Sequence, residues 1–426
     1  MTSGEKRLKV LISAYACEPG RGSEPGVGWE WATRLPAYHD VTVLTRSNNQ
    51  HVIEQHLDSG KRHSNPKFVY LDLPEWILCL KKAGVLPVYV YYMLWQLAAS
   101  RKIRRLGNSF DIIHHVTFNS FRFPGAWWSS GQTVILGPLG GGSITATQFR
   151  RCYGSRWILE KIREYSIRFW KINPWTARSL RNAKAILVVG DELRNRFESA
   201  GLNTEAMLET ALPQGLENRL TTTRPEARRN FLWVGNLEPW KGWQIAIEAF
   251  AMATNSGLGN SKLVVIGKGS QRSAAHKYAG ALGVSEQVVF MEHLPRDEVW
   301  NLMAKSRALV FSSVRDTSGN VVIEAMGLNC PVICFEHQGV AMITDENCAI
   351  RVKPRKWNDS VRDFCSAILS IAENDELVER MGNAGRRKAT EEHSWDTKIK
   401  FVLHKYDLIV GASEDHASTA TMKARP

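Results

Sequence analysis

The sequence lacks the features that mark membrane-spanning, secreted and disulfide-stabilised proteins. Its longest mostly apolar stretch, residues 86–99, has 14 residues, whereas a membrane-spanning helix needs roughly 20. The N-terminal residues lead directly into an apolar strand pattern, without the hydrophobic core of a signal peptide. The seven cysteines show no paired spacing, which favours a reducing compartment. We therefore expect a cytoplasmic protein.

The first half of the chain is poor in acidic residues. Residues 1–210 contain 28 Lys and Arg but only 17 Asp and Glu, which gives +11 of the total net charge of +13. This imbalance predicts that an anionic partner meets the first half. The length of 426 residues, with 44% hydrophobic and 23% charged residues, is typical of a soluble globular enzyme with two or three domains.

Short apolar runs alternate with segments of helical pattern throughout the chain. This alternation predicts an α/β fold with two Rossmann-like, doubly wound domains. Pro213, Gly215 and Pro225 place a linker between them, within residues 201–229. The apolar runs read as buried parallel strands at residues 8–14, 41–44, 68–71, 110–118, 133–136, 185–189, 231–237, 262–266, 288–290, 308–311 and 331–335.

A glycine-rich loop follows the first predicted strand, with glycines at positions 20, 22, 26 and 28. Glycines at these positions allow tight turns and close approach of the backbone to a ligand. The spacing is G-x-G-x-x-x-G, which differs from the dinucleotide-binding G-x-G-x-x-G. The next predicted strand ends in Thr45-Arg46-Ser47, without an acidic residue for the ribose. Both observations count against a nicotinamide cofactor.

The most informative stretch is residues 311–343, which reads as strand, polar loop, short helix and strand. Asp316 falls on the loop and Glu324 on the helix, eight positions later. Ligands of doubly wound sheets bind at the carboxyl ends of strands, where this loop lies. The loop also leads into a helix N-terminus, whose free N–H groups can bind an anion. Two carboxylates at this spacing can bracket one ligand.

This stretch resembles the E-x7-E element and the EAMxxGxPVI run of the retaining family-four glycosyltransferases, with Asp316 where a glutamate is usual. The segment ACEPGRGSEPGVGW is similar to a common bacterial version of the first loop of that family, and the pair HHVTF and GPLGGGS resembles one of its bacterial polysaccharide subgroups. The resemblance implies a GT-B fold, in which two domains face each other across a cleft. Residues 1–205 would form the acceptor-binding domain and residues 215–394 the nucleotide-sugar donor domain, with a last helix at 395–412 packing back on the first domain.

The resemblance also implies roles for individual residues. Lys241, in GNLEPWKG, would neutralise the diphosphate leaving group, and Asn236 stands where the family has Arg, so Lys268 or Arg272 would take over that role. Asp316 would hold the sugar hydroxyls and Glu324 the ribose. The implied catalytic residues are His114, Lys241 and Asp316; the donor-binding residues are Gly235, Asn236, Lys241, Gly267, Gly269, Ser318, Gly319, Asn320 and Glu324; the acceptor loops contribute Gly22, Gly26, His115, Gly140 and Gly141.

Two adjacent histidines lie near the end of the strand predicted at 110–118. In a regular strand His114 and His115 point to opposite faces, so one can face the cleft while the other is structural. The resemblance favours His114 for the cleft, although a bend at the strand end would present His115 instead.

No metal or cofactor is expected. The chain contains no D-x-D pair to hold a metal–diphosphate complex, so Lys241 and helix N-termini would neutralise the diphosphate without a metal. Cys330 and Cys334 lie along one predicted strand and read as core residues.

The sequence thus predicts a retaining, metal-independent hexosyltransferase (EC 2.4) of exopolysaccharide or lipid-linked glycan type. The donor would be a UDP- or GDP-sugar and the acceptor a growing glycan, expected to be linked to a polyprenyl diphosphate. The alternatives are a nucleotide-sugar epimerase or a phosphorylase on the same fold, and a basic nucleic-acid-binding protein. No pyridoxal-phosphate lysine context and no nucleic-acid-binding motif is recognisable.

Two segments of the first half combine aromatic residues with Lys and Arg, at residues 76–107 and 150–184. Cations attract anionic headgroups and Trp and Tyr settle at the membrane interface. This composition predicts a peripheral position at the inner face of the plasma membrane. The alternative is that the apolar residues belong to the core and the basic ones to a solvated face.

Overall fold

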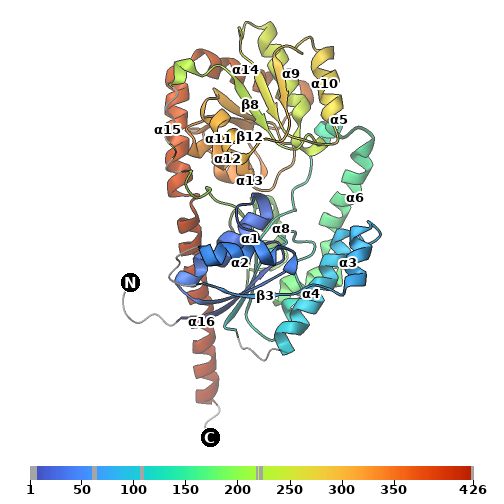
Figure 1. The fold of residues 1–426 in the computed structure, drawn as a ribbon, viewed down its shortest axis with the longest axis vertical. Helices are drawn as coiled ribbons and strands as arrows, with labels where there is room; N and C mark the ends of the chain where they lie inside the picture. Colours follow the sequence, from blue (N-terminus) through green and yellow to red (C-terminus); the bar gives the residue numbers. More distant parts are fainter. Residues whose placement is uncertain (1–6, 60–64, 106–109, 217–218, 220–223, 424–426) are drawn as a thin grey trace. The chain divides into compact units, whose positions relative to one another are not determined.

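The computed structural model describes residues 7–59, 65–105, 110–216, 219 and 224–423. The chain folds into two compact units, coloured by sequence in Figure 1. Unit 1 comprises Met1–Gly142, Ser166–Glu209 and Lys398–Pro426, and unit 2 comprises Ser143–Tyr165 and Thr210–Thr397. Each unit is built around one parallel sheet, as the alternating apolar runs predict.

The sheet of unit 1 has the strand order β3-β2-β1-β4-β5-β6-β7 in the described part of the chain. All its pairings are parallel, and β4 and β5 are buried along their whole length. The order reverses between β1 and β4, which is the switch point where such folds bind ligands. The strands are β1 (Lys9–Ala14), β2 (Asp40–Thr45), β3 (Lys67–Tyr70), β4 (Ile112–Thr117), β5 (Val134–Leu139), β6 (Ala185–Val188) and β7 (Thr204–Ala206).

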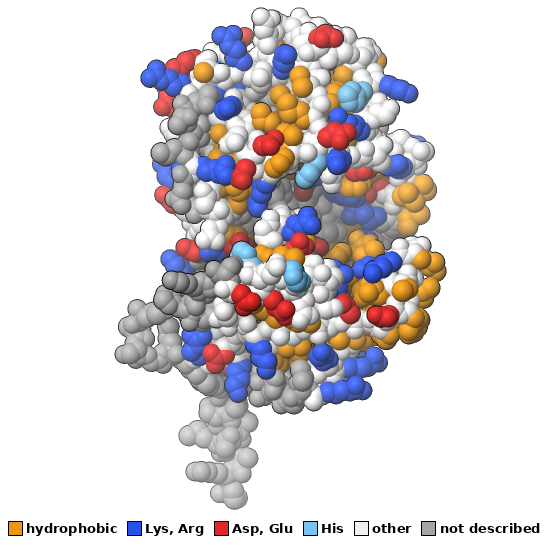
Figure 2. All heavy atoms as spheres, viewed as in Figure 1, with side chains coloured by type: hydrophobic (Ala, Val, Ile, Leu, Met, Phe, Trp, Pro, Cys, Tyr) orange, Lys and Arg blue, Asp and Glu red, His pale blue; other side chains and the backbone are white. Residues whose placement is uncertain are grey.

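The helices of unit 1 flank this sheet and include a pair with an unusual surface. The α3–α4 pair exposes large apolar side chains, among them Trp76 and Val85 at 66% and 69% exposure. Figure 2 shows hydrophobic side chains gathered at the right-hand edge, where Figure 1 draws α3. The helices are α1 (Ser23–Arg34), α2 (Gln50–Ser59), α3 (Glu75–Lys82), α4 (Val88–Arg105), α7 (Pro174–Asn182), α8 (Asp191–Glu198) and α16 (Trp395–Lys423) from Lys398 onward.

The sheet of unit 2 repeats this topology, with the order β10-β9-β8-β11-β12-β13 and parallel pairings throughout its described residues. Its switch point lies between β8 and β11. The strands are β8 (Phe231–Val234), β9 (Leu263–Ile266), β10 (Val288–Met291), β11 (Ala308–Phe311), β12 (Val332–Phe335) and β13 (Ala349–Val352). The helices are α5 (Arg150–Tyr153), α9 (Trp243–Asn255), α10 (Arg272–Ala281), α11 (Arg296–Ala304), α12 (Asn320–Gly327), α13 (Gln338–Ile343), α14 (Trp357–Glu373) and α15 (Asp375–Glu391).

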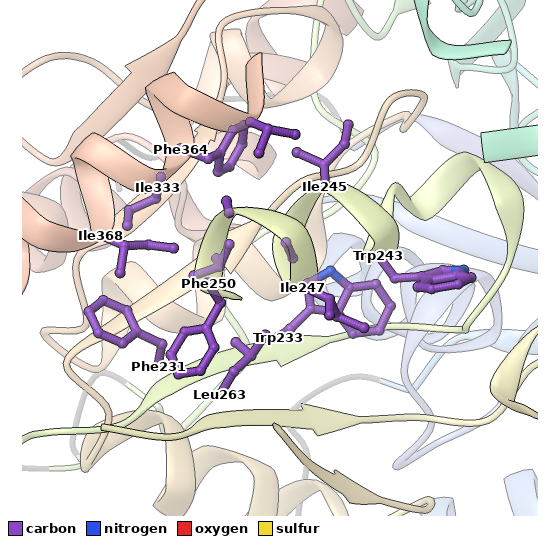
Figure 3. Close-up of a cluster of buried hydrophobic side chains, with 14 of the residues drawn as sticks. Phe231, Trp233, Trp243, Ile245, Ile247, Phe250, Leu263, Ile333, Phe364 and Ile368 are labelled. Carbon is purple, nitrogen blue, oxygen red and sulfur yellow. The ribbon is translucent and has the colours of Figure 1, made fainter. Parts of the chain in front are cut away.

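The core of unit 2 lies between the sheet and helices α9 and α14. Figure 3 shows Phe231 and Leu263 of the sheet facing Phe250 of α9 and Ile368 of α14. Cys330 and Cys334 are buried in this unit without a disulfide, as core residues are expected to be.

Residues 143–165 depart from the domain boundaries expected from the sequence. The division at 205–215 assigned them to the first domain, but they belong to unit 2. Phe149, Cys152, Tyr153 and Trp157 from this segment enter the unit 2 core. Helix α6 (Trp157–Arg168) begins in unit 2 and ends in unit 1. We call residues 143–165 the crossing segment.

Three further differences concern short or terminal elements. Strand β7 lies inside the expected linker, because a run of three residues is too short to show a strand period. Strand β13 is likewise absent from the sequence prediction. Helix α16 begins at Trp395 and continues past the expected end at 412, to Lys423.

Candidate functional site

Two loops of unit 2 meet at the switch point of its sheet. The loop after β8 carries Lys241, and the loop after β11 carries Asp316. Because β8 and β11 are neighbouring parallel strands, their carboxyl ends lie at the same edge of the sheet, where ligands of this fold class bind. The two residues that the sequence assigned to the donor chemistry are therefore brought together.

Lys241 and Asp316 form an ion pair, in which the Lys241 ammonium donates to Oδ2 of Asp316. The other carboxylate oxygen accepts the Thr317 N–H at 2.9 Å. Burial acts to raise the pKa of Asp316, but the charge and hydrogen bond of Lys241 outweigh it, so the pKa lies below its usual value. Both side chains remain partly exposed, at 21% and 16%. The site thus presents a cation and an ionised carboxylate that a ligand can reach.

Side chains from outside the loop hold the main chain of Asp316 on both sides. Its N–H donates to Oε1 of Gln338 at 2.8 Å, and its carbonyl accepts from Oγ of Ser143 at 3.2 Å. The Gln338 Nε2 in turn donates to the carbonyl of Ile144 at 3.2 Å. Gln338 adopts this position with φ of +55°, a left-handed conformation that disfavours residues with a Cβ. The crossing segment and Gln338 together fix the direction of the Asp316 carboxylate.

Tight backbone contacts explain several glycines of the site. A Cβ on Gly267 would lie 1.9 Å from the carbonyl oxygen of Gly235, and one on Gly269 would lie 2.4 Å from that of Leu237. Gly242, next to Lys241, has φ of +60° and would place a Cβ 2.1 Å from the carbonyl oxygen of Ser312. These glycines let the loops after β8, β9 and β11 pack directly on one another. Their role in the structure is to hold the loops together.

The start of α12 follows the Asp316 loop. Gly319 precedes the helix in the left-handed conformation, with φ of +59°, and Asn320 is its first residue. The Ser318 hydroxyl donates to Oδ1 of Asn320 at 3.1 Å. The first N–H groups of such a helix have no carbonyl partner within the helix and carry the positive end of its dipole. The predicted anion-binding turn thus lies at the start of α12.

Glu324, in the second turn of α12, has its own cation. Arg296 of α11 donates to its Oε1 at 2.9 Å, and the Arg296 guanidinium lies over the Trp300 ring, 4.6 Å from the centroid. Arg296 was not among the site residues predicted from the sequence. A basic residue in the first turn of a helix beside the sheet edge, in the run Pro295-Arg296-Asp297, was its only signal.

The substitutes proposed for the missing arginine of the GNLEPWKG loop fall into two kinds. Lys268 is exposed at this edge of the sheet, as is Asn236, which stands at the position of the missing arginine. Arg272 instead donates through Nη1 to the carbonyls of Gly267 and Met291, both at 3.1 Å. It ties two strand ends together, so Lys268 is the better placed cation for a phosphate.

A buried carboxylate of the crossing segment, Glu160, helps to hold the loop that carries Asp316. Glu160 accepts hydrogen bonds from Thr145, Arg163 and Arg315. Burial acts to raise its pKa, but the hydrogen bond of Arg163 and the charge of Arg315 leave the pKa below its usual value. Arg315 precedes Asp316 in the chain, so this network also restrains the loop. Glu160 lies 155 positions from Arg315, and no local pattern could reveal the contact.

The two histidines of β4 do not reach the surface, which corrects the assignment of His114 to a cleft and that of His115 to the acceptor loops. They do point to opposite faces, as expected. His114 bonds to the Tyr406 hydroxyl and the Gly137 carbonyl, at 2.7 and 2.8 Å. His115 bonds to the Ser13 and Tyr92 hydroxyls, at 3.0 and 2.9 Å. Burial lowers the pKa of His114 to about 4 and that of His115 to about 3, so both are neutral core residues.

The glycines assigned to the acceptor loops lie in unit 1 near its switch point. Gly22 precedes α1, and a Cβ on Gly26 would lie 2.1 Å from the Arg21 carbonyl oxygen. The Gly140 N–H donates to the Asn119 carbonyl at 2.6 Å, and Gly141 has φ of +78°. These residues shape the turns after β1 and β5.

Within residues 7–59, 65–105, 110–216, 219 and 224–423 we find no group of three His, Cys, Asp or Glu side chains placed to hold a metal ion. No helix in the same part of the chain is both long and apolar enough to cross a membrane.

Comparison with known proteins gives matches in unit 2 and along the whole fold. Residues 217–388 match the family model described as "Glycosyl transferases group 1". Alpha-D-kanosaminyltransferase of Streptomyces kanamyceticus is 25% identical over 49% of this chain and 57% of its own length. N-acetylgalactosamine-N,N'-diacetylbacillosaminyl-diphospho-undecaprenol 4-alpha-N-acetylgalactosaminyltransferase of Campylobacter jejuni is 24% identical over 37% and 41%. The chain thus spans about half the length of the curated relatives it matches.

Solved structures align over nearly the full chain. WaaG, "a glycosyltransferase involved in lipopolysaccharide biosynthesis", has a TM-score of 0.63 at 16% identity, over 94% of this chain and 100% of its own. Anabaena Alr3699/HepE in complex with UDP and glucose has a TM-score of 0.58 at 15% identity, over 94% and 100%. Such identities establish the fold alone. The chain therefore has the GT-B fold, and its second unit contains a glycosyl transferases group 1 domain.

Proposed function

We propose that the protein is a retaining glycosyltransferase that moves a hexosyl unit from a UDP- or GDP-sugar to a growing glycan, without a divalent metal. The observation that carries this proposal is the Lys241–Asp316 pair at the switch point of the group 1 domain. It places a cation for a diphosphate beside a carboxylate for sugar hydroxyls, at the sheet edge where ligands of this fold class bind.

Lys241 has the central role in the transfer. Negative charge builds up on the diphosphate as the glycosidic bond breaks, and a fixed cation stabilises that charge most in the transition state. Asp316 neutralises Lys241 before the donor arrives, so the ammonium is held in place. The N-terminus of α12 supplies further N–H donors for the phosphates.

Asp316 and Glu324 orient the donor. Asp316 accepts hydrogen bonds from the sugar hydroxyls, because its ionised carboxylate keeps acceptor capacity beyond the bond from Lys241. Glu324 binds the ribose hydroxyls while Arg296 holds it in position. We assign no side-chain nucleophile: the acceptor hydroxyl attacks the face that the diphosphate leaves, and the departing phosphate takes its proton. This route retains the anomeric configuration.

The comparisons support particular substrates. The Anabaena structure with a similar fold holds UDP and glucose, which favours a UDP-sugar as donor. The Campylobacter jejuni relative is named for a diphospho-undecaprenol substrate, which favours a polyprenyl-diphosphate-linked acceptor in the synthesis of a polysaccharide. For such a substrate we also propose a peripheral position at the inner face of the plasma membrane.

The surface of α3 and α4 supports that position. Trp76, Val85 and Val88 are exposed there, between 49% and 69%. The last turn of α4 carries Lys102, Arg104 and Arg105, and each cation near an anionic surface contributes about 1 kcal/mol of attraction. Flotation with anionic vesicles should retain the protein at low salt, and Trp76→Ser with Val85→Ser should reduce it. Protein that fails to float at low salt would contradict this position.

The transferase proposal is tested first by donor binding. We expect one UDP- or GDP-sugar from a panel to raise the melting temperature, and Glu324→Ala to weaken this stabilisation because the ribose loses its acceptor. The stabilising sugar is then incubated with a polyprenyl-diphosphate-linked acceptor, and NMR gives the anomeric configuration of the product. A panel that stabilises nothing contradicts the transferase, and an inverted product contradicts retention. Interconversion of the sugar nucleotide without acceptor would indicate an epimerase.

A further inference from the structure

A second group of polar residues lies at the carboxyl edge of the unit 1 sheet. Tyr15 follows β1 directly, Arg46 follows β2 directly, and Asp72 comes two residues after β3. These three strands are parallel neighbours, so the three residues share one edge of the sheet. This is the edge where doubly wound sheets bind ligands. None of these residues takes part in the donor chemistry.

Two cations lie at this edge, and among the described residues neither has an ion-pair partner. The Arg46 guanidinium lies over the Tyr15 ring, 4.5 Å from its centroid, and Lys81 of α3 lies over the Tyr91 ring of α4, at 4.4 Å. In the part of the chain that the structure describes, neither forms a salt bridge with a carboxylate. Asp72 hydrogen-bonds to the Ser47 hydroxyl instead.

The positive charges act on each other. Burial lowers the pKa of Lys81, the charge of Arg46 lowers it further, and Asp72 acts in the opposite direction. Two like charges that act on each other in this way, each lying against an aromatic face, would be stabilised by an anion that contacts both. Both side chains keep intermediate exposure, so an anion can reach them from solvent.

The Tyr15 hydroxyl is a third donor without an acceptor. The residue is 4% exposed, and among the described residues nothing hydrogen-bonds to its hydroxyl. Burial raises the pKa of Tyr15 to about 12, partly offset by the charge of Arg46, so the hydroxyl keeps its proton. A buried donor without a partner calls for a ligand or a bound water.

An apolar surface adjoins the cations. Lys81 lies near the end of α3, next to Leu80, and the turn into α4 exposes Val85. Trp76, one turn earlier on α3, is exposed as well. The exposed apolar side chains therefore lie on the same pair of helices as Lys81 and its ring partner Tyr91, and Figure 2 shows hydrophobic side chains at the edge where α3 is drawn. A ligand with an anionic head and a hydrocarbon chain fits this combination.

We propose that Arg46, Lys81 and the Tyr15 hydroxyl bind the diphosphate of a lipid-linked acceptor, and that its prenyl chain lies along the exposed apolar side chains of α3 and α4. Two cations match the charge of a diphosphate, and charge-assisted hydrogen bonds to its oxygens replace the unfavourable contact between the cations. The proposal rests on the transferase function and names the residues of unit 1 that would recognise its acceptor.

The test is calorimetric titration of the full-length protein with farnesyl diphosphate in mild detergent, in saturating UDP so that the donor site is filled. Arg46→Ala and Lys81→Ala should each weaken binding about tenfold, as loss of one charge-assisted contact does. Lys82→Ala is the matched control, because Lys82 is the exposed neighbour of Lys81, and it should stay within twofold. Arg46→Lys should keep more affinity than Arg46→Ala, which separates lost charge from misfolding.

Two further ligands identify the source of the anion. Inorganic pyrophosphate should bind at least tenfold more weakly than farnesyl diphosphate, because it lacks the chain, and farnesol should not bind measurably. Equal affinity for pyrophosphate and farnesyl diphosphate would overturn the lipid assignment. Wild-type affinity in both Arg46→Ala and Lys81→Ala would overturn the site.

The outcome is separable from that of the donor site. If no nucleotide binds, the titration is repeated with Lys241→Ala in place of saturating UDP. Binding of farnesyl diphosphate that still depends on Arg46 then supports this site, while the transferase assignment of unit 2 fails by itself.

Discussion

The two sheets share one topology but use their polar residues in opposite ways. In unit 2 the polar residues of the switch point, Lys241 and Asp316, stand on loops after the strands and remain partly exposed as an ion pair. In unit 1, His114 and His115 stand inside β4 and are buried as neutral, hydrogen-bonded groups. A polar residue can serve a ligand when it follows the strand end, and becomes part of the core when it precedes it.

The largest effect should come from Lys241→Ala, which removes the cation of the partly exposed ion pair in unit 2. We expect kcat to fall about 10²–10³-fold, as when a single oxyanion donor is lost. Lys262→Ala, an exposed lysine of the same unit, is the control and should leave kcat unchanged. Steady-state kinetics with the stabilising donor measures both. Wild-type turnover in Lys241→Ala would move the leaving-group role elsewhere.

Asp316→Ala should rank second, with a loss in kcat of about 10²-fold, since the sugar loses its carboxylate and Lys241 its partner. Asp316→Glu should stay within about threefold, because the longer arm keeps the charge and restores the glutamate usual in the resembled family. The same kinetic assay decides. Unchanged kinetics in the Ala variant would assign the sugar hydroxyls to another residue.

Gln338→Gly sharpens the comparison, because it leaves the Lys241–Asp316 ion pair in place and removes the side chain that bonds the Asp316 N–H and the Ile144 carbonyl. We expect kcat to fall about tenfold, since small displacements of catalytic groups are costly. The melting temperature should change little, because glycine relieves the left-handed backbone while two hydrogen bonds are lost. Hydrogen exchange at the Asp316 amide should become faster. Slow exchange together with wild-type kcat would contradict the role of Gln338 in positioning Asp316.

Only part of this difference between the two units could be predicted from the sequence. Apolar runs locate almost all strands, and the spacing of Asp316 and Glu324 on a loop and helix locates the site, because both signals are local. The partners of those residues are not local: Gln338 and Ser143 reach Asp316 from positions 22 and 173 residues away. The burial of His114 depends on Tyr406, which is 292 residues away, so a strand-end histidine could not be told from a core histidine.

On the buried side, His114→Asn should change stability and not catalysis. Loss of buried hydrogen bonds should lower the free energy of unfolding by about 1–3 kcal/mol, while kcat per folded molecule stays within twofold. Thermal unfolding and active-site titration separate the two. A large loss of kcat at full stability would return His114 to the reaction.

The pH dependence of unfolding tests the same histidines. Their pKa values in the folded protein, about 4 and about 3, lie below the ordinary value near 6.5. The unfolded chain therefore binds protons that the folded chain does not, so stability is full above about pH 6.5 and falls as the pH drops towards 4. His114→Asn should make this fall shallower. An unchanged slope would mean that His114 is protonated in the folded state.

The smallest effect is expected from metal removal. Under the proposal that Lys241 and the α12 N-terminus neutralise the diphosphate, excess EDTA should leave the rate unchanged. Loss of activity that Mg²⁺ or Mn²⁺ restores would mean that a metal ion, and not Lys241 with the α12 N-terminus alone, neutralises the diphosphate.

The crossing segment limits how this protein can be rearranged by recombination. The chain passes between the units at residues 142/143, 165/166, 209/210 and 397/398, so no single breakpoint separates them. A gene fusion that joins residues 1–209 to the second half of a homologue would supply Phe149, Tyr153 and Trp157 from the wrong parent to the unit 2 core. Viable chimaeras should inherit residues 143–165 from the parent that provides residues 210–397. Exchange of donor specificity between relatives should therefore require breakpoints at the four positions where the chain passes between the units.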